Sequence, residues 1–375
     1  MGFMRALAWV LLAGCAFHAG NPGASDASGS GDSGGDSRGD SSPLGKRRVK
    51  LTFHNATSEA LVDFAALVVL DATRIEYSDC QPSGADLRFF DSDDTTPLPY
   101  EIEAWNAGAK SYVWVNVPQI DLGDADFIYM HYGDPQATDA QDPPAVWTHA
   151  QGIYHLAEDP GPGNAGDIRD SSSAANHGTA SAAMTSSDLV DAAIGKGLRL
   201  EGNNTGVTAA STALGTYTWS MWLQGDAAPV TGSGNKEPLN EDPNFDFAWD
   251  HNSAAFTGAA AQEDETPAWH AVHAGTLAGR TWYHLSATYD GSSTLCAYLD
   301  GAMNACASSG APLAPGGQLV IGAATSVQAS FTGYIDEVRI YDVAQSPARI
   351  AAEHASQRAD DANPFVTFGA PEAVP

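Results

Sequence analysis

Short strand-like runs, separated by turn-forming clusters, recur along this chain from about residue 49. Val49, Leu51 and Phe53 alternate with polar residues, and residues 112–117 and 127–132 are further short runs expected to form strands. Such alternation buries one face of a strand. The chain also has 38 glycines and 21 prolines, which favour turns over long helices. The sequence therefore predicts an all-β protein, and 375 residues are enough for two β-sandwich domains.

The charge balance is strongly acidic. There are 46 Asp and Glu residues against 17 Lys and Arg, a formal net charge of −29. Phosphate binding needs clustered cations, so nucleic acid is excluded as a partner and adsorption to anionic lipid is disfavoured. The carboxylates serve solubility outside the cell, and they also offer many oxygen ligands for calcium.

The first residues have the pattern of an export signal. Arg5 is followed by an apolar run over residues 6–12, which is too short to span a bilayer. The run ends in Leu-Ala-Gly-Cys at residues 12–15, which resembles the lipobox of bacterial lipoproteins. The resemblance implies cleavage before Cys15 and a lipid on its thiol, the chain's only attachment to a membrane. Ala16 at the next position implies the outer membrane in a Gram-negative host. An ordinary signal peptide is the alternative.

Residues 16–45 consist largely of Ser, Gly and Asp and predict a disordered linker. A β-sandwich is expected over residues 46–137, followed by a second linker over 138–150. Four segments of this sandwich, residues 84–93, 98–105, 113–118 and 128–133, are similar to domain-of-unknown-function family 2341. That resemblance implies a β-rich fold and no activity. Trp114 lies in an apolar strand and is expected in the core, although Trp105 and Trp114 could instead form a sugar-stacking platform.

The second domain is expected over residues 151–370. Its segments resemble, in order, a laminin-G-like or concanavalin A-like jelly roll: residues 170–178, 195–202, 217–222, 281–291, 297–301 and 331–341. Asp-Gly pairs at 290–291 and 300–301 predict hairpin turns. Ser346-Pro347 predicts the start of a short helix that runs to about Gln357.

Three cysteines remain after lipidation of Cys15. Cys296 and Cys306 flank the hairpin at Asp300-Gly301 and face each other if its loop has three residues. A two-residue loop would place Leu295 opposite Cys306 instead. An exported compartment permits the disulfide, and Cys80 would stay unpaired and buried.

The resemblance to laminin-G-like folds implies one calcium ion as the cofactor. Asp170, Asn176, Gly178 and Asp336 are the ligands that it implies. The alternative is that Asp170 caps a turn, while Asp336 and Glu337 pair with Arg339 on a solvated strand.

Catalysis is not expected, because no hydrolase or glycosidase motif occurs in the sequence. His270 and His273 beside Trp269 could form a metal or acid–base pair, but ordinary surface histidines are the simpler interpretation. We expect a cell-surface protein for adhesion or recognition that binds a glycan or another surface protein. Trp269, in a segment interpreted as a loop, is the predicted ligand-binding residue. The alternatives are a structural subunit of a surface assembly and a polysaccharide-acting glycosidase or lyase.

Overall fold

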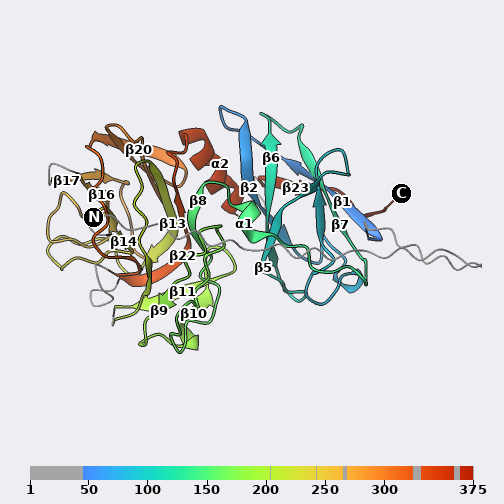
Figure 1. Ribbon diagram of the computed structural model, residues 1–375, viewed down its shortest axis with the longest axis horizontal. Helices are drawn as coiled ribbons and strands as arrows, with labels where there is room; N and C mark the ends of the chain where they lie inside the picture. The colour runs from blue at the N-terminus through green and yellow to red at the C-terminus, as the bar shows by residue number, and fades with distance from the viewer. Residues whose placement is uncertain are drawn as a thin grey trace, which may run out of the picture. The chain divides into compact units, whose positions relative to one another are not determined.

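The computed structural model describes residues 45–202, 204–241, 243–264, 268–323, 331–358 and 364–374. These residues belong to one compact unit and form four sheets with antiparallel strand pairing (Figure 1). The sheets enclose two separate apolar cores, so the predicted all-β fold with two sandwiches is confirmed. No helix in the described part of the chain is long and apolar enough to cross a membrane.

The first sandwich consists of a six-stranded and a three-stranded sheet. The larger sheet contains β1 (Arg47–Phe53), β3 (Arg88–Phe90), β4 (Pro97–Leu98), β7 (Phe127–Tyr132), β23 (Val366–Phe368) and β24 (Glu372–Ala373). The smaller sheet contains β2 (Leu61–Leu70), β5 (Tyr100–Ala104) and β6 (Ser111–Ile120). Val49, Leu51 and Phe53 all point into the core between them, as their alternation predicts.

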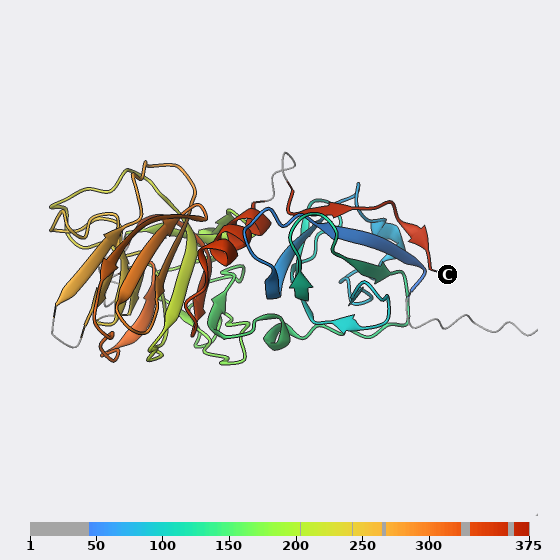
Figure 2. The same ribbon diagram turned by 90° about the horizontal axis from the view of Figure 1, so that it is seen from above.

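The C-terminal segment returns to this first sandwich. Strand β23 pairs with β1, with Leu51 opposite Phe368 and Phe53 opposite Val366. Figure 2 shows these two strands, red and blue, side by side. The second domain was expected to run from residue 151 to residue 370. Strand β23 lies within that range but belongs to the first sandwich, so the strand pairing does not follow the expected boundary. A pairing over more than 300 residues leaves no local signal in the sequence.

The second sandwich consists of an eight-stranded and a seven-stranded sheet. The first contains β8 (Ala150–Tyr154), β10 (Leu189–Asp191), β11 (Lys196–Glu201), β13 (Tyr217–Gly225), β18 (Tyr283–Tyr289), β19 (Thr294–Leu299), β20 (Ala302–Ser308) and β22 (Thr332–Tyr341). The second contains β9 (Thr179–Ala180), β12 (Val207–Ala210), β14 (Leu239–Glu241), β15 (Phe245–Ala248), β16 (Ala259–Glu263), β17 (Trp269–His273) and β21 (Gln318–Ile321). Trp219 and Phe245, one from each sheet, stack in the shared core with ring centroids 4.9 Å apart.

The hairpin of β19 and β20 has the two-residue loop of one predicted register and the facing cysteines of the other. Its loop has two residues, because Leu299 pairs with Ala302. A bulge at Asn304, between the pairs Tyr298–Met303 and Ala297–Ala305, then shifts the register, so Cys296 lies opposite Cys306 and the two form a disulfide. Cys80 is a free, half-buried thiol, and burial raises its pKa to about 12.

Two α-helices occur among the described residues, α1 (Pro143–Val146) and α2 (Pro347–Gln357). The predicted helix after Ser346 is confirmed, since the Ser346 hydroxyl accepts a hydrogen bond from the Arg349 amide (3.1 Å). Helix α2 contacts both sandwiches. Its Ser356 accepts from the Leu67 amide on β2 (3.0 Å), and its Gln357 accepts from the Trp222 indole on β13 (2.6 Å).

Glu241 at the end of β14 makes stability depend on pH. Its carboxylate accepts hydrogen bonds from the Thr212 amide and the Asn244 side chain, but burial raises its pKa to about 7. The folded state therefore binds a proton more tightly than the unfolded chain, and stability is lost as pH rises from about 4.5 through 7. We expect wild type to lose roughly 3 kcal/mol relative to Glu241→Gln over this range.

The measurement is urea unfolding of both proteins at pH 5, 6, 7 and 8, with Glu263→Gln as the control carboxyl. The difference between wild type and Glu241→Gln should change steadily with pH. A constant difference would contradict a protonated Glu241.

Candidate functional site

Trp269 lies at the edge of the seven-stranded sheet. It begins β17, the outermost strand, and pairs with Glu263 on β16. The segment was interpreted as a loop, and this was wrong, because residues 269–273 form a strand. The indole is half-buried, and its ring lies edge-on to Phe256 with centroids 6.4 Å apart. A tryptophan held in this way can offer part of its ring to a ligand.

Two neighbouring loops lie next to these aromatic residues. Thr231 and His251 form a bridge between the loops, and the Asn252 amide donates to the Asn235 side chain (3.3 Å). The His251 ring contacts Phe256, with centroids 5.0 Å apart. We call Trp269, Phe256, His251, Asn235 and Asn252 the aromatic edge. It combines an apolar ring face with amide and imidazole groups, which is the chemistry that sugar recognition needs.

His270 and His273 do not act together. Three residues apart on a strand, their side chains point to opposite faces of the sheet. His270 lies 2.9 Å from the Asp264 carboxylate, and His273 is exposed. The interpretation of these residues as ordinary surface histidines therefore fits the structure better than a joint metal or acid–base site.

The four predicted calcium ligands do not form one cluster. Both oxygens of Asp170 already accept hydrogen bonds, from the Ile153, Ser172 and Asn176 amides and the Ser172 hydroxyl. Gly178 exchanges its backbone bonds with Ile168. Asn176 bonds through its side chain to Ala210, and its backbone oxygen accepts from the Tyr154 hydroxyl. Asp170 therefore organises a turn and has no unpartnered oxygen to offer a calcium ion.

Asp336 lies apart from Asp170. The Asp170 carboxylate accepts from the Ile153 amide, and Ile153 pairs with Arg339 on β22. Asp336 lies beyond the bulge in β22 and accepts from the Ile194 amide instead (2.7 Å). These residues do not fit a shared calcium site, and calcium stays a prediction that chelation can test. The alternative of a solvated Asp336–Glu337–Arg339 strand is wrong in one respect, because all three side chains are buried.

Residues that the sequence analysis did not single out surround Arg339. Glu101 and Glu103 from β5 and His155 after β8 meet Glu337 and Arg339 between the two sandwiches. Trp114 is fully buried, as predicted, but it packs with this group and outside the first core. The alternation of Glu101 and Glu103 on one strand was the available signal, and their partners lie far away in the sequence.

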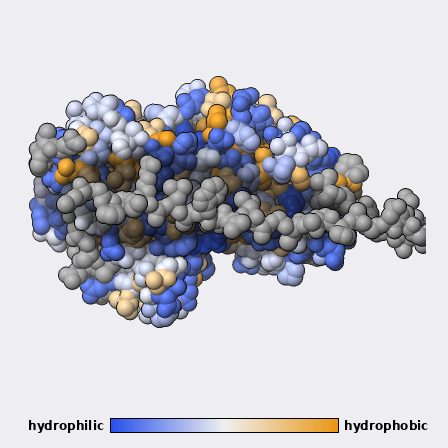
Figure 3. Space-filling model, in the orientation of Figure 1, coloured by the Kyte–Doolittle hydropathy of each residue, from blue (hydrophilic) through white to orange (hydrophobic). Residues whose placement is uncertain are grey.

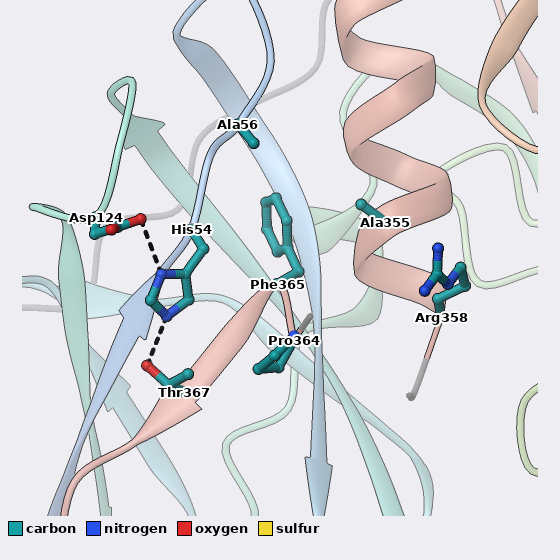
Figure 4. Close-up of a pocket in the computed structure, with 8 residues that line it drawn as sticks. All are labelled: His54, Ala56, Asp124, Ala355, Arg358, Pro364, Phe365 and Thr367. Carbon is teal, nitrogen blue, oxygen red and sulfur yellow. Dashed lines mark hydrogen bonds and ion pairs between the residues drawn. The ribbon is translucent and has the colours of Figure 1, made fainter. Parts of the chain in front are cut away.

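A separate cavity of about 510 Å³ lies beside β1, β23 and the end of α2 (Figure 4). The His54 ring in it bonds to the Asp124 carboxylate (2.9 Å) and to the Thr367 hydroxyl (2.8 Å). Carboxylate, imidazole and hydroxyl in this order occur in hydrolases. Here the Asp124 side chain is 74% exposed and the Thr367 hydroxyl also faces the Thr52 carbonyl (3.4 Å). Neither group is therefore held in a dry site for nucleophilic attack.

Comparison with known proteins supports the description of both sandwiches. Two family models match the chain. Residues 201–351 match the "Concanavalin A-like lectin/glucanases superfamily", and residues 83–157 match "Domain of unknown function (DUF2341)". Both resemblances expected from the sequence are therefore borne out at the level of domains. No curated protein matches the chain. Cys15 lies outside the described residues.

Several solved structures resemble about half of this chain. The binding domain of Paraclostridial Mosquitocidal Protein 1 is 12% identical, with a TM-score of 0.40 over 55% of this chain and 52% of that one. Domain 4 of AbnA, a GH43 extracellular arabinanase from Geobacillus stearothermophilus in complex with arabinotriose, is 17% identical, with a TM-score of 0.40 over 54% and 96%. The botulinum neurotoxin serotype G binding domain is 9% identical, with a TM-score of 0.40 over 55% and 50%.

Proposed function

We propose that this chain is a non-catalytic recognition protein of the bacterial cell envelope that binds a glycan at the aromatic edge. The observation that carries the proposal is the half-buried Trp269 ring, braced by Phe256 and adjacent to the loops of Asn235 and Asn252. An apolar ring face suits the apolar face of a pyranose, and neighbouring amides suit its hydroxyls. On the face shown in Figure 3, the visible described residues are mostly hydrophilic with separate apolar patches, which on this face favours a polar ligand over a broad apolar partner.

Burial of the acidic groups argues against a glycosidase. Burial raises the pKa of Glu241 to about 7 and that of Glu103 to about 8, and burial also raises the pKa of Asp336. Such carboxyls could act as general acids, but their side chains lie inside the protein, where no polysaccharide can reach them. We therefore assign binding without bond cleavage to this chain.

The proposal places the two sandwiches outside the cell membrane. Lipid on Cys15 would anchor the chain, in the outer membrane of a Gram-negative host, and the Ser/Gly/Asp linker over residues 16–45 would hold the sandwiches away from it. Metabolic labelling with a clickable fatty acid tests the anchor. Label on wild type and none on Cys15→Ser is expected, and label on both would contradict lipidation at Cys15.

The function is tested on an array of polysaccharides and glycans, with calcium and then with a chelator, using the full chain in detergent. Each bound glycan is afterwards analysed for shortening by chromatography. The proposal expects binding to at least one glycan class and no cleavage. Cleavage would support an enzyme, and silence across the array in both conditions would favour a protein partner or a structural subunit. Loss of binding with the chelator would support the predicted calcium ion.

Replacing Trp269 by alanine should weaken binding of the glycan found on the array by about tenfold, or about 1.4 kcal/mol. The lost interaction is the contact between ring and sugar. Isothermal titration calorimetry measures the change in affinity. Trp282→Ala is the control, because Trp282 directly precedes β18 in the eight-stranded sheet and its ring packs on Tyr334, away from the aromatic edge. Equal affinity of wild type and Trp269→Ala would place the ligand elsewhere.

A further inference from the structure

A buried ionic centre joins the two sandwiches. We define it as Glu101, Glu103, His155, Glu337 and Arg339. The two glutamates come from β5 of the first sandwich, His155 follows β8, and the last two lie on β22 of the second. Trp114 and Trp147 close it from water, with ring centroids 5.3 Å apart and the Arg339 guanidinium over both rings at 4.3 and 4.8 Å. The side chains of all five members are at most 6% exposed.

A bulge in β22 directs its acidic residues into this centre. Glu337 has a φ of 51°, and the pairing of β22 with β13 shifts register at this point. Ile335 and Val338 both point into the core of the second sandwich. Asp336 and Glu337 between them therefore both leave that core and lie on the side of the first sandwich. Backbone strain at a residue other than glycine is typical of a functional position.

Three members of the centre have the geometry of metal ligands. A ligand atom each of Glu103, His155 and Glu337 lies within 4.8 Å of the other two. The His155 Nδ1 is 2.7 Å from Glu337 Oε1 and 3.8 Å from Glu103 Oε2. Tetrahedral ligands around zinc, at about 2.1 Å from the ion, are roughly 3.4 Å apart. A small adjustment of these side chains would therefore place all three around one ion.

The surrounding groups orient each of these ligands. Glu101 Oε2 lies 3.3 Å from His155 Nε2, so a carboxylate holds the ring nitrogen that faces away from the other two ligands. Metal-binding histidines commonly have this carboxylate partner. The Trp114 indole donates to Glu103 (2.9 Å), and Arg339 donates twice to Glu337 (2.6 and 3.1 Å). Glu101 itself accepts from the Trp147 indole and the Ser171 hydroxyl.

The centre also lacks positive charge. The three glutamates of the centre and the neighbouring Asp336 together bring four carboxyls. The groups that can carry positive charge are the Arg339 guanidinium and the His155 imidazole. Among the described groups, Glu103 Oε1 and Asp336 Oδ1 are buried without a hydrogen-bond partner, although their side chains are 1% and 0% exposed. A buried carboxylate oxygen without a partner is costly, so the centre needs a cation or protons.

We propose that this centre is a structural site for one divalent transition-metal ion of the zinc class, held by His155, Glu103 and Glu337. An imidazole nitrogen with carboxylate oxygens suits zinc, whereas calcium prefers oxygen ligands only. The side chains are sealed from solvent, so the ion enters as the chain folds and ties the two sandwiches together. The proposal is independent of what the aromatic edge binds.

The test is the metal content of the full chain, refolded from denaturant with zinc, dialysed and analysed by mass spectrometry. We expect one zinc per chain and, after refolding with cobalt, visible absorption bands of a tetrahedral ion. His155→Gln should lower the zinc content at least tenfold, and Glu101→Gln should weaken zinc affinity about 10–100-fold. His270→Gln and Cys80→Ser are controls outside the centre and should keep the ion.

Measurements on wild type keep the proposal open to refutation even where a variant does not fold. Zinc during refolding should raise the melting temperature, and a chelator present during refolding should lower it. Wild type that refolds without bound zinc, with the same melting temperature in zinc and in chelator, would overturn the proposal. The charge would then be balanced by protons on Glu103 and Asp336.

Discussion

Replacing Arg339 by methionine is expected to lower the free energy of unfolding by about 3–5 kcal/mol, the largest effect of any single change considered for this chain. The substitution keeps an unbranched apolar side chain but leaves the Glu337 carboxylate buried without the guanidinium that now donates to it twice. The contacts of Arg339 with the Trp114 and Trp147 rings are lost as well. Urea unfolding followed by tryptophan fluorescence measures the loss.

Two controls separate the buried charge from loss of an arginine in general. Arg199→Met removes a partly exposed ion pair with Asp226 (2.8 Å) and should cost less than about 1 kcal/mol. Adding Glu337→Gln to Arg339→Met removes the stranded charge and should restore part of the loss. A loss below 1 kcal/mol for Arg339→Met would mean that the centre does not hold the sandwiches together.

Phe365→Ala should cost about 3 kcal/mol in the same assay. Phe365 directly precedes β23, is 5% exposed and packs on Phe64 and Phe53, with ring centroids 5.4 and 6.2 Å away. Its removal leaves a cavity in the first core, most of whose residues precede Phe365 by more than 200 positions in the sequence. Phe368→Ala is the matched control at the far end of β23, where the ring is only partly buried under Arg74 (4.8 Å), and it should cost about 1 kcal/mol. Equal losses would show that the C-terminal segment does not complete the first core.

Local patterns predicted much of the fold. The alternation around Val49, Leu51 and Phe53 identified a strand, and Ser346-Pro347 identified the start of α2, because both signals lie within a few residues. The Cys296–Cys306 register could not be decided from the loop length, since a bulge at Asn304 changes the count by one. The return of β23 to β1 was missed for another reason. Three apolar residues after a helix do not specify which sheet edge they join.

The candidate sites were less predictable. Trp269 as the ligand-binding residue stays a prediction, and its ring is half-buried. Its strand was not foreseen, because Pro267 two residues earlier argues against a central strand, whereas β17 is an edge strand. Of the ionic centre, only the pairing of Glu337 with Arg339 was considered, on a strand expected to be solvated. Glu101, His155 and Glu337 are far apart in the sequence, and the bulge at Glu337 breaks the alternation that would assign its side chain to a face.

A crystal structure of the protein with the tightest glycan from the array tests the central claim most directly. The account predicts sugar against the Trp269 ring, with hydroxyls in reach of the loops that carry Asn235 and Asn252. Sugar in the cavity beside His54, or anywhere away from the aromatic edge, would contradict it.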